Sequence, residues 1–295
     1  MDHSPPIADL QAPARRARPR VPRLHLLELE DQPWLPARVR DGATDFLEAG
    51  QHVVGAARLA APHVRAALEA GGTRQILDLA SGGGGPALRL QRRLAAEGLE
   101  VEVMLTDRYP NRRAFDHAIR DGDGQVSARA EPIDARRVPA ELPGLRTLFN
   151  ALHHFEPADA RAILADAVGA RRPIAAFELS ERSWVGLLSM LLVPLWVLLL
   201  VPTIRPFRWS RVLLTYLVPA IPLVCMWDGL VSQLRSYRVD ELLELAESAD
   251  PEASFAWRAG ALRRRPPHGT FLVGVPKPLP APTEPTSATD APTRP

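Results

Sequence analysis

The chain has 295 residues, enough for one large domain or two small ones, and its 36 Lys and Arg against 34 Asp and Glu give a formal net charge of +2. Lys277 is the only lysine and Cys225 the only cysteine. A phosphate-loop NTPase, an internal disulfide and a cysteine metal cluster are therefore excluded. The single cysteine also indicates a reducing, cytoplasmic location. Because the charges form no basic stripe, we expect no nucleic-acid partner.

The amino-terminal region divides into two parts by composition. Residues 1–23 are rich in Pro, Ala and Arg, lack the apolar stretch of a signal peptide, and are expected to be disordered. Residues 24–70 have a helical pattern, which predicts a helical cap with a kink at Pro62.

Strands and helices alternate over residues 71–183, which predicts a parallel sheet covered by helices on both faces. The expected strands are 74–80, 101–107, 126–134, 145–152 and 172–179. Residues 228–276 add an amphipathic helix and two more strands, which close the sheet as an antiparallel hairpin. The expected fold class is therefore α/β, a Rossmann-like seven-stranded, mostly parallel sheet. Residues 277–295 are mostly Pro, Thr and Ala and predict a disordered tail.

The stretch "ILDLASGGGGPALRL" places a run of glycines between the first strand and the next helix. Pro86 suits the first turn of that helix, so residues 81–85 form a strand-to-helix turn. Glycine permits positive φ there and lets a ligand approach the main chain. The free N–H groups at the start of the helix favour negative or polar ligand atoms.

Three carboxylates, Asp78, Asp107 and Asp134, fall at the expected ends of the first three strands. A carboxylate after the second strand can accept hydrogen bonds from both hydroxyls of a ribose. Because ligands of parallel sheets lie at the carboxyl ends of the strands, one bound cofactor would meet all three carboxylates.

The glycine turn also matches the dinucleotide pattern G-x-G-x-x-A, so an NAD(P)-dependent oxidoreductase is an alternative. Asp78, however, stands four residues before Gly82, where its charge would repel a pyrophosphate. A cationic ligand such as a sulfonium with an amino group is favoured instead, and the chain has no Tyr-x-x-x-Lys pair for hydride chemistry.

These segments resemble the class I S-adenosylmethionine-dependent methyltransferases. "LDLASGGGG" looks like their first motif, D-x-G-x-G-x-G, with Ala80 and Ser81 in place of the more usual Gly-Cys pair. Asp107 in "LTDRYPN" corresponds to the acidic residue on the ribose, and "PIDARRVP" resembles the segment that places Asp134 beside the adenine. "FNALHHF" is similar to the fourth-strand motif. The resemblance covers residues 50–181 and 254–276.

The resemblance implies S-adenosyl-L-methionine as the cofactor. The residues that it assigns to cofactor binding are Asp78, Ser81, Gly82, Gly84, Asp107, Arg108, Asp134 and Asn150. His153 and His154 would face its reactive end, where they either act in catalysis or pack and orient the substrate. Glu178 and Glu181 lie near the same cleft and are expected in a solvated loop.

The insert at residues 184–227 begins with twenty residues without a charge, followed by Arg205, Arg208 and Arg211 and a second uncharged run. A two-pass hairpin would send these arginines outward, against the positive-inside tendency. We therefore expect the insert to lie on the membrane surface, with its arginines at lipid phosphates. A soluble lid or a dimer face is the alternative.

The sequence thus predicts an S-adenosylmethionine-dependent methyltransferase that acts on a lipophilic small molecule or lipid at the cytoplasmic face of a membrane. A non-catalytic, membrane-associated S-adenosylmethionine-binding protein is a further alternative. Beyond the insert, Asp228, Arg235 and Tyr237 are polar residues that we expect to return to the cleft. In the alternative interpretation, Arg235 pairs with Asp228 in a structural role.

Overall fold

The computed structural model describes residues 21–263 and 269–278, so most of the two predicted disordered ends lies outside the described residues. Within them, one sheet has the strand order β3-β2-β1-β4-β5-β7-β6. The strands are β1 (Gln75–Asp78), β2 (Glu102–Leu105), β3 (Val126–Ala128), β4 (Leu145–Phe149), β5 (Ile174–Glu178), β6 (Phe255–Ala261) and β7 (Thr270–Pro276). Strands β1 to β5 pair in parallel, and β7 runs antiparallel to both β5 and β6. The predicted fold class is confirmed.

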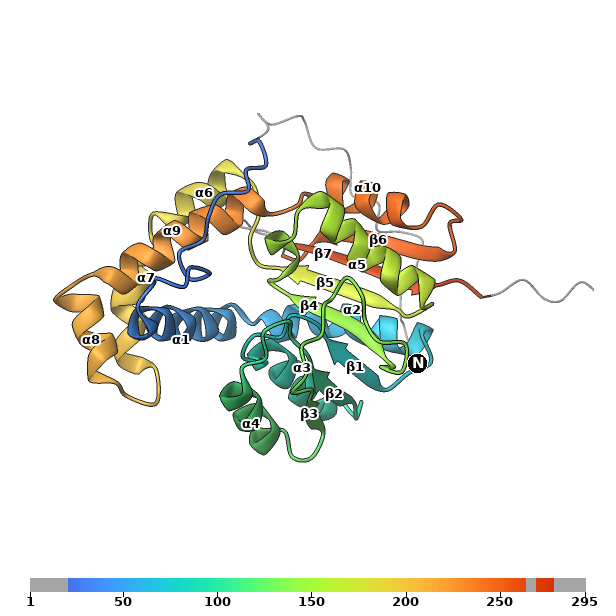
Figure 1. Ribbon diagram of the computed structural model, residues 1–295, viewed down its shortest axis with the longest axis horizontal. Coiled ribbons are helices and arrows are strands. Elements are labelled where there is room, and N and C mark those ends of the chain that lie inside the picture. The colour runs from blue at the N-terminus through green and yellow to red at the C-terminus, as the bar shows by residue number, and fades with distance from the viewer. Residues whose placement is uncertain (1–20, 264–268, 279–295) are drawn as a thin grey trace, which may run out of the picture.

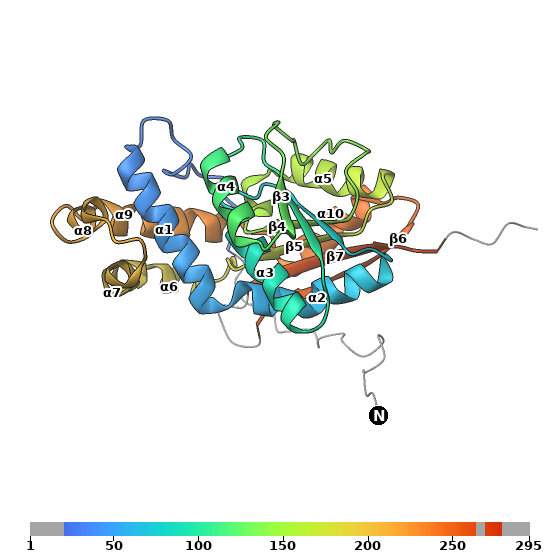
Figure 2. The same ribbon diagram turned by 90° about the horizontal axis from the view of Figure 1, so that it is seen from below.

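Helices cover both faces of this sheet (Figure 2). The helices α2 (Ala56–Ala70), α3 (Gly85–Ala96) and α4 (Arg112–Asp121) lie on one face, and α5 (Pro157–Gly169) and α10 (Val239–Ala249) on the other. Successive strand residues point to opposite faces, so Ile76 joins the first apolar core and Leu77 the second.

The amino-terminal cap differs from its prediction in two respects. It consists of α1 (Ala37–Val54) followed by α2, and the chain bends at Gly55, whose φ is +75° and suits glycine. Pro62 lies inside α2, which continues through that residue, and the kink expected there stays a prediction. Residues 21–28 form no helix, and the Leu24 N–H donates to the Leu234 carbonyl.

The hydrophobic insert folds into short helices that form a lobe with α1 beside the sheet (Figure 1). They are α6 (Trp184–Met190), α7 (Val193–Leu200), the 3₁₀ turn η2 (Val201–Thr203), α8 (Trp209–Tyr216) and α9 (Ala220–Arg235). The lobe has its own apolar core, in which Phe46 of α1, Val197 of α7 and Ile221 of α9 are buried. Because α9 continues to Arg235, the insert does not end at residue 227 as predicted.

No single helix of the described residues has the length and apolar run needed to cross a bilayer. Two pairs of helices reach that length and composition together, α6 with α7 and η2, and α8 with α9, but they are bent by 45° and 75°.

Two of the three arginines of the insert join it to α1, and the buried Arg211 corrects the expectation that all three lie at lipid phosphates, whereas Arg205 is exposed. Arg211 is 2% exposed, forms an ion pair with Asp45 of α1, and donates from Nη2 to the Ile204 and Pro206 carbonyls at 2.7 and 2.8 Å. Arg208 also approaches Asp45, at 3.3 Å. The insert is therefore joined to α1 by a buried charge as well as by apolar packing.

Asp45→Ala should destabilise the protein by about 3 kcal/mol, because it leaves the buried guanidinium of Arg211 without its carboxylate. The free energy of unfolding from urea titration measures the effect. Asp41→Ala, at an exposed position of the same helix, is the matched control and should change it by less than about 0.5 kcal/mol. Equal effects of the two substitutions would contradict the structural role of the Asp45 pair.

Candidate functional site

The glycine turn lies between the end of β1 and the start of α3, at the carboxyl edge of the sheet. Gly84 has φ +75°, and a Cβ there would lie 2.5 Å from Cδ1 of Leu105, so only glycine fits. A Cβ at Gly82 or Gly83 would meet nothing within 4 Å. The turn therefore presents an open main chain to a ligand. Ala80, where the resembled motif has glycine, takes a φ of +52°.

Ser81 fixes the shape of this turn. Its hydroxyl donates to the Asp78 carbonyl at 2.9 Å and accepts from the Thr106 N–H at 3.1 Å, which ties the end of β1 to the end of β2. The Gly84 N–H donates to the Ser81 carbonyl at 2.7 Å. The Ser81 side chain is thus used within the protein, and its contact with a cofactor stays a prediction.

Asp78 lies beneath the turn, only 2% exposed, between β1 and β4. The Thr147 hydroxyl donates to its Oδ1 at 2.6 Å. Burial raises the pKa of Asp78 to about 7, and the nearby Asp107 charge adds to the rise. A cationic group above the turn would be attracted to this carboxylate and would favour its charged form.

Asp107 follows β2 and lies against the glycine turn, as the sequence predicts. Its Oδ2 accepts from the Gly82 N–H at 2.9 Å, and its Oδ1 accepts from the Tyr109 N–H at 2.8 Å. Each carboxylate oxygen can accept further hydrogen bonds. The exposed Arg108 comes next, with Nη1 3.8 Å from Oδ2 of Asp134.

Asp134 does not end a strand, contrary to its prediction, because β3 ends at Ala128. The loop that follows still returns to the site, since the Ile133 N–H donates to the Asp107 carbonyl at 2.8 Å. Arg136 donates to Asp134 from Nε and Nη2, and these hydrogen bonds lower the pKa of Asp134 to about 2. The carboxylate is therefore ionised and already has a cationic partner.

Asn150 connects the carboxyl ends of β4 and β5. It has φ +49°, its N–H donates to the Phe177 carbonyl, and its Oδ1 accepts from the Leu179 N–H at 2.7 Å. Its predicted contact with a cofactor is untested.

His153 and His154 follow β4 in the 3₁₀ turn η1 (Leu152–His154). Nδ1 of His153 lies 2.6 Å from Oε2 of Glu178, whose Oε1 accepts from the Leu152 N–H at 2.8 Å. Glu178 is the last residue of β5 and 1% exposed, so its expected place in a solvated loop is wrong. It is buried because it holds the histidine turn.

The amino-terminal segment adds Glu28 to this region, a residue that the sequence interpretation missed. Oε2 of Glu28 lies 3.2 Å from Nδ1 of His154, and Oε1 lies 3.8 Å from Nε2 of His153 and 3.2 Å from Nη1 of Arg235. Arg235 thus approaches Glu28 and the histidine turn and does not pair with Asp228, which accepts the N–H groups of Leu29 and Glu30. No local motif marks Glu28, because its partners lie far along the chain.

Tyr237 also lies near the segment, where its hydroxyl donates to the Phe155 carbonyl at 2.7 Å. Burial raises the pKa of Tyr237 to about 12. It therefore stays protonated and fastens α9 to the turn after β4.

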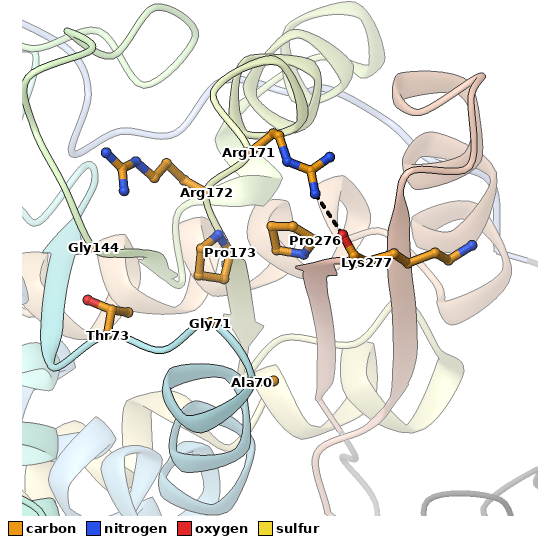
Figure 3. A pocket seen from close by; sticks show the side chains of 9 residues that line it. All are labelled: Ala70, Gly71, Thr73, Gly144, Arg171, Arg172, Pro173, Pro276 and Lys277. Carbon is orange, nitrogen blue, oxygen red and sulfur yellow. Dashed lines mark hydrogen bonds between the residues drawn. The ribbon is translucent and has the colours of Figure 1, made fainter. Parts of the chain in front are cut away.

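A cavity of about 190 Å³ lies at the opposite edge of the sheet (Figure 3). Its lining includes Thr73, Gly144 and Pro173, which precede β1, β4 and β5, and Arg171, which donates to the Lys277 carbonyl. It therefore lies away from the glycine turn and does not belong to the site described above.

No family model and no curated protein matches this sequence. Among solved structures, the chain is similar to the S-adenosylmethionine-dependent methyltransferase SibL in its apo form, with a TM-score of 0.50 and 17% identity over 78% of this chain and 57% of that one. The chain has the class I methyltransferase fold.

Two further solved structures are similar to this chain at a lower TM-score. One is a candidate O-methyltransferase from Nostoc punctiforme PCC 73102, with a TM-score of 0.49 and 15% identity over 84% of this chain and 62% of that one. The other is the O-methyltransferase NcsB1 from neocarzinostatin biosynthesis, with a TM-score of 0.49 and 16% identity over 81% and 59%. The chain thus spans less than two thirds of each of these structures.

Asp78→Asn should stabilise the protein by an amount that grows as the pH rises from about 4 to about 7. In the folded protein the Asp78 carboxyl keeps its proton up to about pH 7, whereas in the unfolded chain it ionises near its ordinary pKa of 3.8. The wild type therefore loses stability across this range, by up to a few kcal/mol, roughly, and the asparagine avoids that loss while still accepting from Thr147.

Urea titrations of both proteins at about pH 4 and about pH 7.5 measure this difference. Asp116→Asn, at an exposed position of α4, is the control and should give no pH-dependent gain. A stability gain of Asp78→Asn that is the same at both pH values would contradict the buried, protonated carboxyl.

Proposed function

We propose that the protein is an S-adenosylmethionine-dependent methyltransferase that acts on a lipophilic small molecule. The observation that carries this proposal is the glycine turn, which is open at Gly82 and Gly83, with the Asp78 carboxyl beneath it and the Asp107 carboxylate beside it. The similarity to SibL, whose name describes the same cofactor, supports it at the level of the fold.

The charges around the turn favour a sulfonium cofactor over a dinucleotide. Asp107 would accept from the ribose hydroxyls, since its oxygens lie at the exposed side of the turn. Asp78 would attract the cationic amino-acid end, whereas a pyrophosphate above the same turn would meet the Asp107 carboxylate and would oppose the ionisation of Asp78. Arg108 and Asp134 border the site on the side where the loop after β3 returns, and we assign that side to the adenine.

The methyl acceptor would bind beyond the ends of β4 and β5, beside His153 and His154. Methyl transfer requires an acceptor atom that is held in line with the methyl group and that loses its proton where it is a hydroxyl. Glu178 fixes the orientation of His153, and the side chain of His154 is 38% exposed. We therefore assign to these histidines the positioning and activation of the acceptor.

Purified protein should bind S-adenosylmethionine and not NAD, and Asp107→Ala should weaken that binding at least about tenfold, because charged hydrogen bonds contribute about 1.5–3 kcal/mol each. Isothermal titration calorimetry with both ligands measures the affinities. Asp116→Ala on α4 is the control and should bind as the wild type does. Tighter binding of NAD, or unchanged affinity of Asp107→Ala, would contradict the proposed cofactor site.

We also propose that the lobe lies on the cytoplasmic surface of a membrane. Its outer side exposes large apolar side chains, of which Leu217 is 75% and Trp209 72% exposed. The others on the insert helices and their connections include Trp184, Leu188, Leu191, Leu192, Leu195, Trp196, Leu199, Phe207, Leu213, Val218, Leu223 and Trp227. An exposed apolar surface of this extent is typical of an interaction site, and exposed tryptophans are typical of a membrane interface.

The bilayer fits this surface better than a soluble lid, because the inner side of the lobe is already packed against α1. The amino-terminal segment adds the exposed Leu24, Leu26 and Leu27 next to the lobe. A substrate drawn from the membrane would then reach the acceptor side through the lobe, which is why we propose a lipophilic substrate.

The wild type should float with phospholipid vesicles in a density gradient, and the double substitution Trp209→Ser with Leu217→Ser should reduce the bound fraction more than tenfold. Each large apolar side chain contributes roughly 1.5–3 kcal/mol when it is buried. Ile119→Ser, at an exposed position of α4 away from the lobe, is the control. Because Arg211 is buried and Arg208 is paired, Arg205 is the exposed arginine of the insert, and salt should weaken the binding only modestly. Wild-type protein that stays at the bottom of the gradient would refute the membrane proposal.

A further inference from the structure

Glu28, His153 and His154 form a compact group of potential metal ligands outside the glycine turn. One carboxylate oxygen and one ring nitrogen from each histidine all lie within 4.8 Å of one another. Glu28 and His153 are each 4% exposed, whereas the side chain of His154 is 38% exposed, so the group lies at the border of the interior with one ligand open to solvent. We name these three residues the His–Glu cluster.

The contact with Glu178 decides which nitrogen of His153 is available to a ligand. An ionised carboxylate only accepts hydrogen bonds, so the ring donates from Nδ1 to Glu178 and keeps a lone pair on Nε2. That lone pair faces Oε1 of Glu28 at 3.8 Å. Nη1 of Arg235 lies 3.2 Å from this oxygen and the Ser232 hydroxyl donates to it at 3.0 Å, so a metal ion is one of the positive partners that this pair of atoms can take. A carboxylate behind the ligating histidine is also typical of metal sites.

The sum of the charges around the His–Glu cluster also favours a bound cation. The carboxylates of Glu28, Asp31 and Glu178 surround the two histidines, and Arg235 supplies one positive charge. With neutral imidazoles the negative charges outnumber the single positive charge of Arg235 by two, and two of the three carboxylates, Glu28 and Glu178, are buried, where an unbalanced charge is costly. One divalent cation would balance them.

Arg235 is the competitor for this position. Its Nη1 lies 3.2 Å from Oε1 of Glu28 and 3.4 Å from Nδ1 of His154. Its Nε is held separately by the Leu26 carbonyl at 2.8 Å, and Nη1 also approaches Asp31 at 3.8 Å. A bound ion would therefore take the Glu28 oxygen from Arg235 and leave the arginine with Leu26 and Asp31.

We propose that the His–Glu cluster binds a divalent cation of the Zn²⁺ type. Two imidazole nitrogens and one carboxylate suit Zn²⁺ and leave a coordination position open for an oxygen ligand. The binding itself is independent of the proposed methyl transfer.

What the ion would do rests on the proposed function. The oxygen ligand would be a hydroxyl of the lipophilic acceptor, which releases its proton to solvent on binding the ion. The oxygen would then form a bond to the methyl carbon as the carbon–sulfur bond breaks. The electron pair stays on sulfur, which becomes a neutral thioether.

The test uses full-length protein purified with Zn²⁺ and freed of excess metal. Mass spectrometry of the metal content should find about one Zn²⁺ per chain. Glu28→Gln and His154→Ala should lower the Zn²⁺ affinity more than about a hundredfold, because loss of an outer partner alone costs about ten- to a hundredfold. His117→Ala is the matched control, since His117 is an exposed histidine that lies 3.8 Å from Asp121. It should leave both the content and the affinity unchanged.

Arg235→Gln sharpens the test, because removal of the competing cation should tighten Zn²⁺ binding. Zn²⁺ that binds only to Arg235→Gln would show that the arginine is the resident cation and would overturn the proposal. Zn²⁺ binding that survives in both Glu28→Gln and His154→Ala would overturn it as well, because the ion would lie elsewhere.

Two further measurements keep these outcomes distinct. Substitution of Co²⁺ into the wild type should give the visible absorption of a nitrogen-ligated, low-coordinate ion, and a spectrum like that of hexahydrated Co²⁺ would overturn the proposal even if a variant fails to fold. Calorimetry of the same samples with S-adenosylmethionine tests the proposed function separately. Intact cofactor binding without Zn²⁺ binding would overturn the metal site alone.

Discussion

Glu28 is the buried carboxylate on which the arrangement at the acceptor side depends. Its partners come from the turn after β4 and from α9, while the residue itself belongs to the segment before α1. A buried charge is tolerated only where partners surround it, so these parts of the chain must come together for any of them to keep its charges inside. Glu178, the last residue of β5, belongs to the same group of buried charges through its contact with His153. The same buried charges therefore fix both the position of the amino-terminal segment and the arrangement of the histidine turn.

The lobe resolves a second constraint, since its helices are too apolar to stand alone in water and too short to cross a bilayer singly. Its inner side packs against α1 through apolar side chains and through the buried ion pair of Arg211 and Asp45. The remaining apolar side chains of the lobe are exposed on its outer side. An exposed apolar surface and a structural core are thus made from the same short helices. Because α9 also carries Arg235 to Glu28, one helix connects the lobe with the surroundings of the histidine turn.

Periodicity and turn chemistry sufficed to predict the sheet, the glycine turn and the position of Asp107, because these features depend on residues close in the sequence. The end of the third strand was misplaced, since β3 stops where its pairing with β2 stops, and no local residue marks that point. Glu178 and Arg211 were assigned to solvent and to lipid because their buried partners are distant in sequence. Glu28 had no local signal at all. Long-range pairing of charges is what a single sequence conceals.

Cys225 has a consequence of a different kind. It is the only cysteine of the chain and lies in the core of the lobe between α1, α7 and α9, where it is 2% exposed. Burial raises the pKa of its thiol, so the folded lobe both shields the sulfur and keeps it protonated. A thiol reagent can reach it only when the lobe separates from α1. The rate at which a thiol reagent labels Cys225 therefore measures how often the lobe opens, in water or on a vesicle, without any engineered probe.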